Sequence, residues 1–456
     1  MNDELLRDAA EPLYGATRPV SEQRRDFLEG RLPVAVYGLG KMGLPLATVY
    51  AETTGNVIGV DIDDSVVDQL NRGMCHIDGE PELPALVSEL VDTGSFTATT
   101  EVKRAASAAS IHVIIVPTLL SPQAEPDLSA LEAAARGIAS GIDPGDQIIV
   151  ECTVPPGTST DRIVPLVAAE SGVHEGEFGV AFCPERTSSG RALQDIRGAY
   201  PKIVGGVDAE STRVAELIYG ELTTNDIITM SDATTAEAVK VFEGVYRDVN
   251  IALANELAQI GDDLGFDANA AIEAANTQPY CDIHTPGPGV GGHCIPYYPY
   301  FLTSQTSADT PLLRTAREVN DGMPSFVVSK LTVLLQERGI DVDGSRLLVL
   351  GLTYRPGVAE TRATPAKPIV DSLVELGGEV FVCDPILNDV SAFGGTPVDL
   401  NDISTLTLDG VVVVTPHDEF DAIDWDAFDD VVIIDGRNTL DLPDRPDRHV
   451  YTIGGR

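Results

Sequence analysis

The chain is poor in lysine and tryptophan, and it is poor in positive charge overall. Six of its 456 residues are lysine and one is tryptophan, while 71 acidic residues outnumber 30 basic ones to give a formal net charge of −41. Without a basic surface the protein has nothing to neutralise phosphates along a duplex, which excludes nucleic acid as a natural partner. Because the acids are dispersed rather than gathered in a tail, we expect a halophilic protein that is kept soluble in concentrated salt.

Cysteine is also sparse, and its spacing argues against a metal site. The six cysteines contain no CxxC pair, so we predict neither bound zinc nor a disulfide framework, and we expect all six to be reduced. No apolar run approaches the ~20 residues of a membrane helix. Residues 1–32 lack the apolar core of a secretory signal and are interpreted as an N-terminal extension. These absences predict a cytoplasmic protein without a membrane partner.

Short apolar runs alternate with helical patterns twice along the chain, which predicts two Rossmann-like α/β domains with doubly wound parallel sheets. An NAD-binding domain is expected at 33–215 and a second α/β domain at 331–456. Between them, a central helical and dimerisation domain at 216–330 begins with a long helix over 232–264, and Gly265 follows as a C-cap. The predicted strands are 33–37, 57–60, 111–116, 147–151, 180–182 and 203–204, then 346–350, 379–383, 411–415 and 431–435.

The first predicted strand runs into a glycine motif typical of dinucleotide sites. Gly38, Gly40 and Gly43 form GxGxxG, with Leu39, Lys41 and Met42 between them, where the turn opens a helix whose N-terminus favours phosphate. Asp61 ends the second strand, where an acid binds ribose hydroxyls and repels a 2′-phosphate, so NAD is preferred to NADP. The alternative is a structural turn with a chance aspartate. Further cofactor contacts are expected at strand ends, at Pro117, Thr118 and Thr153.

One cysteine lies in a setting that ordinary helices and strands do not have. Residues 286–302 read PGPGVGGHCIPYYPYFL, in which four glycines precede Cys294. A thiol on such a loop is accessible and placed to react. A packing cysteine is the alternative.

Partners for the thiol are found in two other segments. Lys240 lies among apolar neighbours of the long helix and is a candidate base, although a surface lysine is the usual reading. Arg247 and Asn250 follow on the same helix. Glu185 and Arg186 follow a strand and either form a plain ion pair or position water and phosphate.

Together these motifs resemble the UDP-glucose/GDP-mannose dehydrogenase family. The segments GLGKMG, VPT, TVPPG, CPER, AEAVK, PGPGVGGHCIP and GLTYRPGVAETRATP occur in family order from residue 33 onward. VYRDVNIALANEL with GPGVGGHCIP is most similar to the UDP-N-acetyl-D-mannosamine dehydrogenase branch. The resemblance implies NAD, a UDP-sugar substrate and a homodimer or higher oligomer formed through the long helix.

The resemblance also implies a four-electron oxidation of the sugar C6 alcohol to a uronate. A base near Lys240 takes the hydroxyl proton, Cys294 captures the aldehyde as a thiohemiacetal that becomes a thioester, and Glu185 aligns the hydrolytic water. Substrate contacts are implied for Arg186, Lys240, Arg247, Gly291, Tyr354 and Arg355, and Arg362 matches an arginine that reaches the cofactor.

The chain departs from the family pattern at several positions. Gly244 stands four residues after the lysine, where the family usually has asparagine, and Tyr298 stands four residues after the cysteine, where it usually has aspartate. Gln278 and Tyr280 stand where the aminosugar branch often has histidine and arginine, and Arg355 replaces a usual lysine.

Three functions remain open from the sequence. The expected activity is oxidation of UDP-N-acetylmannosamine, with UDP-glucose and UDP-N-acetylglucosamine as alternative substrates. A two-electron hydroxyacid dehydrogenase would share the glycine motif and helix lysine but has no need of the Cys294 loop. A catalytically impaired nucleotide-sugar-binding relative would account for Gly244 and Tyr298.

Overall fold

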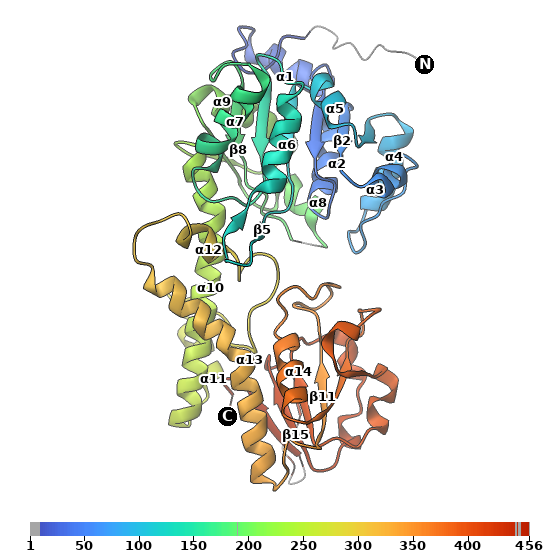
Figure 1. The fold of residues 1–456 in the computed structure, drawn as a ribbon, viewed down its shortest axis with the longest axis vertical. Coiled ribbons are helices and arrows are strands. Elements are labelled where there is room, and N and C mark those ends of the chain that lie inside the picture. Colours follow the sequence, from blue (N-terminus) through green and yellow to red (C-terminus); the bar gives the residue numbers. More distant parts are fainter. Residues whose placement is uncertain (1–9, 189, 443–444, 446–447, 456) are drawn as a thin grey trace. The chain divides into compact units, whose positions relative to one another are not determined.

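A computed structural model of the chain describes residues 10–188, 190–442, 445 and 448–455 (Figure 1). It divides into two compact units, of which the first runs to Phe242 and includes Tyr300–Gln305, and the second contains Glu243–Pro299 and the residues from Thr306 on. The boundary falls inside the helix α10 (Ala233–Leu264), so the predicted central domain is divided between the units. Residues 1–9 of the predicted extension lie outside the described part. Among the described residues, no helix has the length and apolar character needed to span a membrane.

The described residues of the first unit form an eight-stranded sheet in the order β10-β9-β8-β7-β4-β1-β2-β3. Neighbouring strands are parallel except β8 and β9, whose antiparallel pairing reverses the last two strands. The strands are β1 (Val34–Tyr37), β2 (Val57–Val60), β3 (Phe96–Thr99), β4 (Ile111–Ile114), β7 (Gln147–Val150), β8 (Gly179–Phe182), β9 (Lys202–Gly206) and β10 (Ile227–Thr229), with a small hairpin of β5 (Leu119–Leu120) and β6 (Pro126–Asp127).

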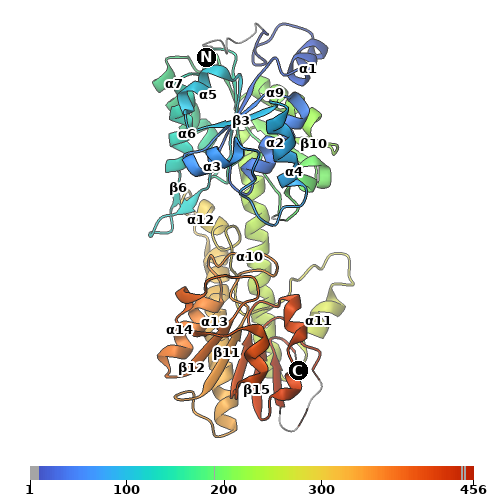
Figure 2. The same ribbon diagram turned by 90° about the vertical axis from the view of Figure 1, so that its right-hand side faces the viewer.

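Helices cover both faces of this sheet (Figure 2). One face packs against α2 (Gly43–Thr54), α4 (Leu83–Asp92) and α9 (Ala209–Leu222). The other packs against α5 (Val102–Ala108), α6 (Ser129–Ala139), α7 (Val164–Ser171) and the first turns of α10. The remaining helical segments of this unit are α3 (Asp64–Leu70), α8 (Ala192–Gln194) and two π-helical turns at Ser159–Ile163 and Asp195–Ala199. Strands buried on both faces explain why the sequence shows continuous apolar runs.

The described part of the N-terminal extension folds onto the first unit. Its helix α1 (Val20–Leu28) buries Phe27 in the core shared with α2 and α9. Arg213 of α9 donates to the Gln23 side chain and the Leu13 carbonyl, at 3.0 and 2.9 Å. Tyr14 donates to Asp208 at 2.7 Å. The described part of the extension, from residue 10 on, is therefore part of the packed unit.

The second unit contains six parallel strands among its described residues, in the order β13-β12-β11-β14-β15-β16. They are β11 (Arg346–Leu350), β12 (Glu379–Cys383), β13 (Thr396–Pro397), β14 (Gly410–Val413), β15 (Val431–Asp435) and β16 (Arg448–Thr452). One face packs against α13 (Pro311–Glu337) and α14 (Ala366–Glu375). The 3-10 turn at Ser391–Phe393 packs on this same face, and the other face packs against the 3-10 turns at Leu400–Thr405, Asp418–Ala422 and Trp425–Ala427. The helices α11 (Ala268–Ala275) and α12 (Tyr298–Thr303) flank the Cys294 loop in sequence.

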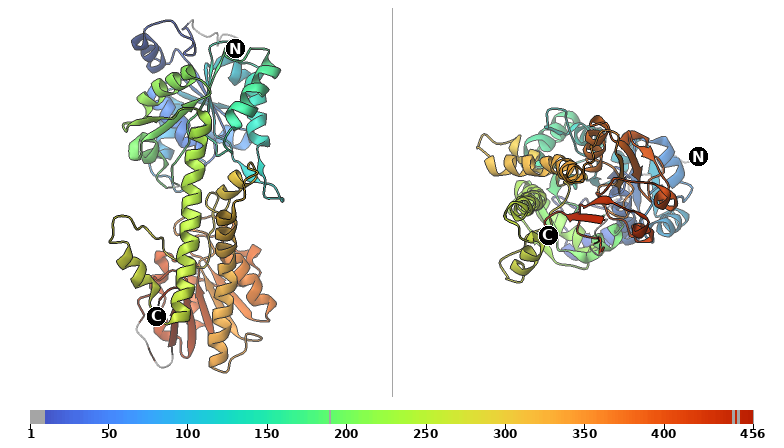
Figure 3. Two further views of the ribbon diagram at one scale, coloured as in Figure 1. Left: turned by 90° about the vertical axis from the view of Figure 1, so that its left-hand side faces the viewer. Right: turned by 90° about the horizontal axis from the view of Figure 1, so that it is seen from below.

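The helix α13 lies alongside the part of α10 in the second unit (Figure 3), and buried polar side chains join the two helices. The side chain of Arg317 pairs with the buried Asp248. Asn255 donates to Asn320 at 2.9 Å, and Asn320 donates to the Asp248 carbonyl at 2.9 Å. Because buried charges and amides are costly unless paired, this network fixes the register of the two helices.

The predicted fold class is confirmed, with differences in detail. The long helix and the strands at 57–60, 346–350, 379–383 and 431–435 match the structure. The strands β3 and β10 are not among the predicted strands, because FTAT and IIT are short and half-exposed. The helix α13 continues past residue 330, the predicted edge of the last domain, to Glu337.

Candidate functional site

The glycine turn after β1 has the shape of a phosphate-binding turn. Gly38 has a φ of 97°, and an added Cβ there would lie 2.6 Å from the Ile115 carbonyl oxygen, so only glycine fits. An added Cβ on Gly43 would lie 3.0 Å from the Ile115 side chain, which brings α2 against the sheet. An added Cβ on Gly40 would meet no atom within 4 Å. This open space lies before the N-terminus of α2, where backbone N–H groups favour an anion.

The Asp61 carboxylate is fixed beside that turn. Its two oxygens accept hydrogen bonds from the Leu39 and Asp63 backbone N–H groups, at 2.9 and 3.1 Å. Asp61 follows β2, at the end of the strand next to β1. A carboxylate keeps acceptor capacity beyond two such bonds and can bind ribose hydroxyls.

The other predicted cofactor residues lie after the neighbouring strands. Pro117 and Thr118 follow β4, and the buried Thr118 hydroxyl has no hydrogen-bond partner among the described residues. Thr153 follows β7. Buried hydroxyls without a partner are rare in folded proteins, so the Thr118 hydroxyl indicates a place for a ligand. Together, the open space at Gly40, Asp61 and this hydroxyl fit a bound dinucleotide.

Glu185 and Lys240 form an ion pair with a separation of 3.4 Å. The Lys240 side chain is buried, with 8% of the residue exposed. Burial raises the pKa of Glu185, but the Lys240 charge and hydrogen bonds from Thr187 outweigh it and hold the pKa below its usual value. Thr187 also donates to the Met42 sulfur at 2.9 Å, which connects the Glu185 loop to the glycine turn. The structure therefore brings two of the predicted site residues, Glu185 and Lys240, into contact.

One turn before Lys240, the buried Glu237 connects α10 to the loop after Thr153. Its carboxylate accepts from the Gly157 and Ser159 N–H groups, at 2.5 and 2.8 Å. Burial raises the pKa of Glu237 to about 7, despite these hydrogen bonds, which lower it. This contact holds the start of α10 beside the strand ends that carry the predicted cofactor residues.

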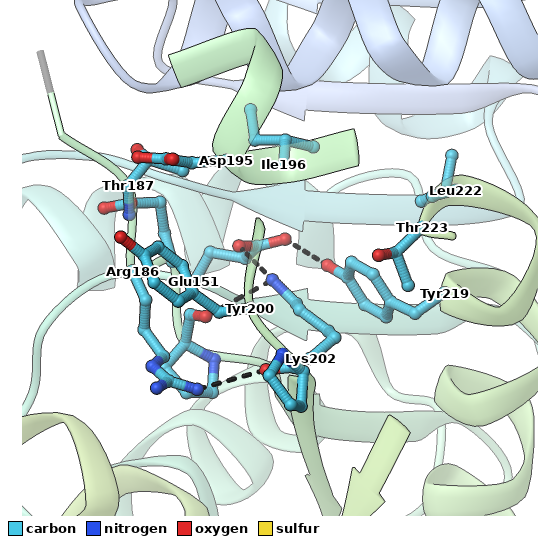
Figure 4. A pocket seen from close by; sticks show the side chains of 13 residues that line it. Glu151, Arg186, Thr187, Asp195, Ile196, Tyr200, Lys202, Tyr219, Leu222 and Thr223 are labelled. Carbon is cyan, nitrogen blue, oxygen red and sulfur yellow. Dashed lines mark hydrogen bonds and ion pairs between the residues drawn. The ribbon is translucent and has the colours of Figure 1, made fainter. Parts of the chain in front are cut away.

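Glu185 is one of the residues that line a small cavity, together with Glu151 and Lys202 (Figure 4). Its volume of about 40 Å³ has room for one or two water molecules. Lys202 donates to Glu151 at 2.8 Å and to the Pro184 carbonyl at 3.3 Å, and its ammonium group lies 4.3 Å from the centre of the Tyr219 ring. Arg186 donates to the Pro201 carbonyl at 3.1 Å. Sequence analysis missed Lys202 and Glu151, although both lie at strand ends.

In the second unit, Cys294 is exposed and lies on a loop whose backbone is anchored on both sides. The Gly292 N–H donates to the Arg362 carbonyl at 2.9 Å. The Cys294 carbonyl accepts from the N–H groups of Tyr297 and Tyr298, at 3.0 and 2.9 Å. His293, next to the thiol, pairs with Glu360 at 2.6 Å. The thiol is thus accessible on a loop of fixed backbone.

In the second unit, Gly291 of this loop packs against the 354–363 segment, which carries other predicted substrate residues. An added Cβ on Gly291 would lie 2.8 Å from the Ala363 carbonyl oxygen and 2.7 Å from Cβ of Tyr354. Burial, the Glu360 charge and the nearby Cys294 raise the pKa of Tyr354. Arg355 and Arg362 are exposed on the same 354–363 segment, and Arg247 is exposed on α10. Asn250 has a structural role, because its amide bonds the Asp282 carbonyl and the His284 N–H, at 2.7 and 2.8 Å.

Arg437 is a candidate that sequence analysis missed. It follows β15, and its guanidinium bonds the carbonyls of Val414 and Gly289, at 3.4 and 3.3 Å. Among the described residues it has no carboxylate partner, and burial lowers its pKa to about 10. Arg437 is half-buried, and a partly desolvated cation without an acid favours an anionic ligand. The sequence signal that could have found Arg437 is its position in the segment DGRN, directly after a predicted strand.

Three family models match consecutive parts of the chain. The NAD binding domain of the UDP-glucose/GDP-mannose dehydrogenase family matches residues 32–223, its central domain matches 234–322, and its UDP binding domain matches 348–442. Together they span most of the chain and include every candidate above.

Relatives and solved structures resemble the chain along nearly its whole length. The UDP-N-acetyl-D-mannosamine dehydrogenase of Pyrococcus horikoshii is 38% identical over 416 residues, which cover 90% of this chain and 96% of the relative. Its structure has a TM-score of 0.86 at 37% identity and covers 93% of this chain and 99% of its own. The NDP-N-acetyl-D-galactosaminuronic acid dehydrogenase of Ralstonia nicotianae is 36% identical over 414 residues, which cover 89% of this chain and 95% of that relative.

Proposed function

The chain belongs to the UDP-glucose/GDP-mannose dehydrogenase family and is an NAD-dependent UDP-sugar dehydrogenase, and we propose that it oxidises UDP-N-acetylmannosamine at C6 to the uronate. The substrate assignment is supported by relatives that bear this activity in their names, at 38% and 35% identity. The four-electron outcome rests on one observation, the exposed Cys294 thiol on an anchored loop.

The proposed first half-reaction converts the C6 alcohol to an aldehyde. NAD, when bound, accepts the hydride of each oxidation. The proposed base for the hydroxyl proton lies near Lys240, whose buried amino group pairs with Glu185. Gly38, Leu39, Gly40, Lys41, Met42, Gly43, Asp61, Pro117, Thr118, Thr153 and Arg362 are the proposed cofactor contacts.

The proposed second half-reaction runs on Cys294. The thiolate adds to the aldehyde carbon and gives a thiohemiacetal, whose oxidation leaves a thioester. Water then adds to the thioester carbonyl and releases the carboxylate and the thiol. Glu185 aligns this water, and its lowered pKa keeps it ionised as an acceptor at neutral pH. Because the aldehyde stays covalently held, it is not released between the two oxidations.

The proposed substrate contacts are arginines and loop residues suited to a nucleoside diphosphate sugar. They are Arg186, Lys240, Arg247, Gly291, Tyr354 and Arg355, and the structure adds Arg437. Guanidinium groups bind diphosphate through paired hydrogen bonds, and a diphosphate would give the half-buried Arg437 an anionic partner.

A UDP-sugar of the N-acetylgalactosamine series is the second candidate substrate. The observation that favours it is the 36% identity to the Ralstonia nicotianae relative. Epimeric sugars differ in the orientation of one hydroxyl group, so the shape and hydrogen-bonding groups of the sugar pocket determine which epimer is the substrate.

A stoichiometry tests the proposal. Purified protein in high salt is supplied with NAD and separately with UDP-N-acetylmannosamine, UDP-N-acetylgalactosamine, UDP-N-acetylglucosamine or UDP-glucose, and NADH is counted per sugar consumed. We expect two NADH per sugar and the highest kcat/KM with UDP-N-acetylmannosamine. One NADH per sugar contradicts the cysteine mechanism, and no turnover of any sugar supports the impaired binding relative.

We also propose that the protein is a homodimer formed through α10. Tyr246, Leu253 and Ile260 recur every seven residues and are 51%, 48% and 40% exposed, and Leu264 extends the stripe at 69%. Residues seven apart lie on one face of a helix, and exposed apolar stripes of this kind bury themselves against a partner. A second copy supplies a matching stripe about a two-fold axis.

A salt-rich cytoplasm is the proposed setting. The net charge of −41 disfavours the compact state unless salt screens it. The described cysteines are all free, and a reactive thiol is maintained in a reducing compartment.

A further inference from the structure

Gly244 is an unusual residue for the interior of a long helix. It lies in α10, Ala233–Leu264, four residues after Lys240, and it is buried. Glycine destabilises a helix interior relative to alanine, so a buried glycine there calls for a packing reason. That reason is an aromatic ring, because a Cβ added to Gly244 would lie 2.8 Å from Cγ and 2.9 Å from Cε2 of Tyr298.

Tyr298 holds the far end of the Cys294 loop. It begins α12, it is 7% exposed, and its N–H donates to the Cys294 carbonyl at 2.9 Å. The residue that packs on Gly244 is therefore one hydrogen-bonded turn from the thiol. Both Gly244 and Tyr298 belong to the second unit.

The near end of the loop is held independently. The Gly292 N–H bonds the Arg362 carbonyl at 2.9 Å, and a Cβ on Gly292 would lie 2.9 Å from the Tyr354 ring. The backbone of Cys294 is thus fixed between the 354–363 segment on one side and the Tyr298 ring on the other. The side chain of Cys294 itself stays exposed.

We propose that Tyr298 and Gly244 form a steric lock that positions the Cys294 loop on α10. Gly244 and Tyr298 are two of the positions at which the chain departs from the family pattern, and because they are in contact we interpret them as one coupled exchange in which a ring and a notch replace two polar side chains. Tyr298 and Gly244 are positioning residues that act through Cys294. The inference rests on the proposed function for its catalytic consequence, and its geometric part stands apart from it.

A double-mutant cycle tests the lock, with kcat and the KM for NAD as readouts. Gly244→Ala drives a methyl group into the ring, and Tyr298→Ala removes the ring. Since a misplacement of about 1 Å can cost about 100-fold in rate, we expect each to lower kcat at least about tenfold with little change in the KM for NAD. The double variant should be no slower than Tyr298→Ala, because the methyl group then has room.

Two matched variants separate the lock from general damage. Gly322→Ala changes another helix glycine of the second unit, in α13, where an added Cβ meets no atom within 4 Å, and it should leave kcat unchanged. Tyr298→Phe keeps the ring and should retain more activity than Tyr298→Ala. Gly244→Asn alone should be as damaging as Gly244→Ala, and Tyr298→Asp added to it should recover activity.

A second readout does not depend on turnover. The rate of iodoacetamide labelling at Cys294 is followed by peptide mass spectrometry, with Cys281 of the same unit as the internal reference. We expect the Cys294-to-Cys281 ratio to change at least threefold, by about the same factor in Gly244→Ala and Tyr298→Ala, to stay constant in Gly322→Ala, and to change less in Tyr298→Phe than in Tyr298→Ala.

Two results would overturn the lock: Gly244→Ala behaving as Gly322→Ala does in both readouts, or independent effects that multiply in the double variant. If the wild-type protein turned over no UDP-sugar, the proposed function would fail, and the labelling pattern would still decide the lock.

Discussion

At the scale of single residues, the central claim is that Cys294 holds the substrate between two oxidations. Cys294→Ser keeps the loop geometry but replaces a good nucleophile with a poor one, because a serine hydroxyl is not ionised near neutral pH. We expect steady turnover to fall by at least about 1,000-fold, consistent with loss of a covalent nucleophile. Rapid mixing with UDP-sugar should still release up to one NADH per site. Unchanged steady turnover in this variant would contradict the nucleophile role.

A second residue-scale prediction concerns the ion pair between Lys202 and Glu151, which lines the small cavity of the first unit. Glu151 is 1% exposed at its side chain and is bonded by Lys202 and Tyr219. Lys202→Met leaves this carboxylate buried without its cation, which typically destabilises a protein by about 3–5 kcal/mol. Urea unfolding in high salt should show this loss. Adding Glu151→Gln should recover much of it, and Lys103→Met, at an exposed lysine of the same unit, should have no effect. A double variant as unstable as Lys202→Met would contradict the ion-pair explanation.

At the scale of elements, the contact between Glu237 and the 157–159 loop predicts a pH dependence. Burial raises the pKa of Glu237 from its usual value of 4.5 to about 7 in the folded protein. Between pH 4.5 and about 7 the folded state therefore holds a proton that the unfolded chain has lost. The resulting contribution to the free energy of unfolding is fully present below the unfolded pKa and disappears as the pH rises through about 7. At 1.36 kcal/mol per pKa unit, the change is on the order of 3 kcal/mol.

Glu237→Gln removes this titration and keeps the shape of the side chain. We expect the wild-type protein to exceed the variant in Tm at pH 5, because the amide cannot accept from both N–H groups. The difference should shrink or reverse at pH 8. Glu256→Gln, at an exposed acid of the same helix, is the matched control and should keep a constant difference. A constant difference in Glu237→Gln as well would show that Glu237 does not titrate in this range.

The elements also show how far sequence reasoning reaches. Strands buried on both faces and the long helix have strong local patterns, so their positions could be predicted. The glycine turn and Asp61 could be paired because their spacing is fixed by two adjacent strands. Local patterns do not show which distant side chains meet, so the contact of Gly244 with Tyr298 and the burial of Arg437 could not be predicted. The roles given to the individual site residues stay predictions until variants are measured.

At the scale of the whole molecule, the apolar stripe of α10 predicts the oligomeric state. Leu253 lies in the middle of the stripe, between Tyr246 and Ile260, and it is 48% exposed. Leu253→Glu places a charge in the proposed interface, where burying an unpaired carboxylate is costly. Light scattering in high salt should give a dimer for the wild-type chain and a monomer for the variant. Leu312→Glu, at another exposed leucine of the second unit, should stay dimeric. A monomeric wild-type protein would contradict the proposal.

The last prediction follows from the charge of the entire chain. With −41 formal charges on 456 residues, self-repulsion extends over a Debye length of about 30 Å at 0.01 M salt and only about 3 Å at 1 M. The free energy of unfolding should therefore rise steeply with the concentration of KCl, and activity should be lost reversibly in dilute buffer. Sucrose at equal osmolality is the control, because it stabilises burial without screening charge. If charge is the cause, salt should restore the fold and sucrose should restore much less. Full activity and an unchanged fold in dilute buffer would sink the halophile hypothesis, while equal rescue by sucrose would mean that marginal packing, rather than repulsion, limits stability.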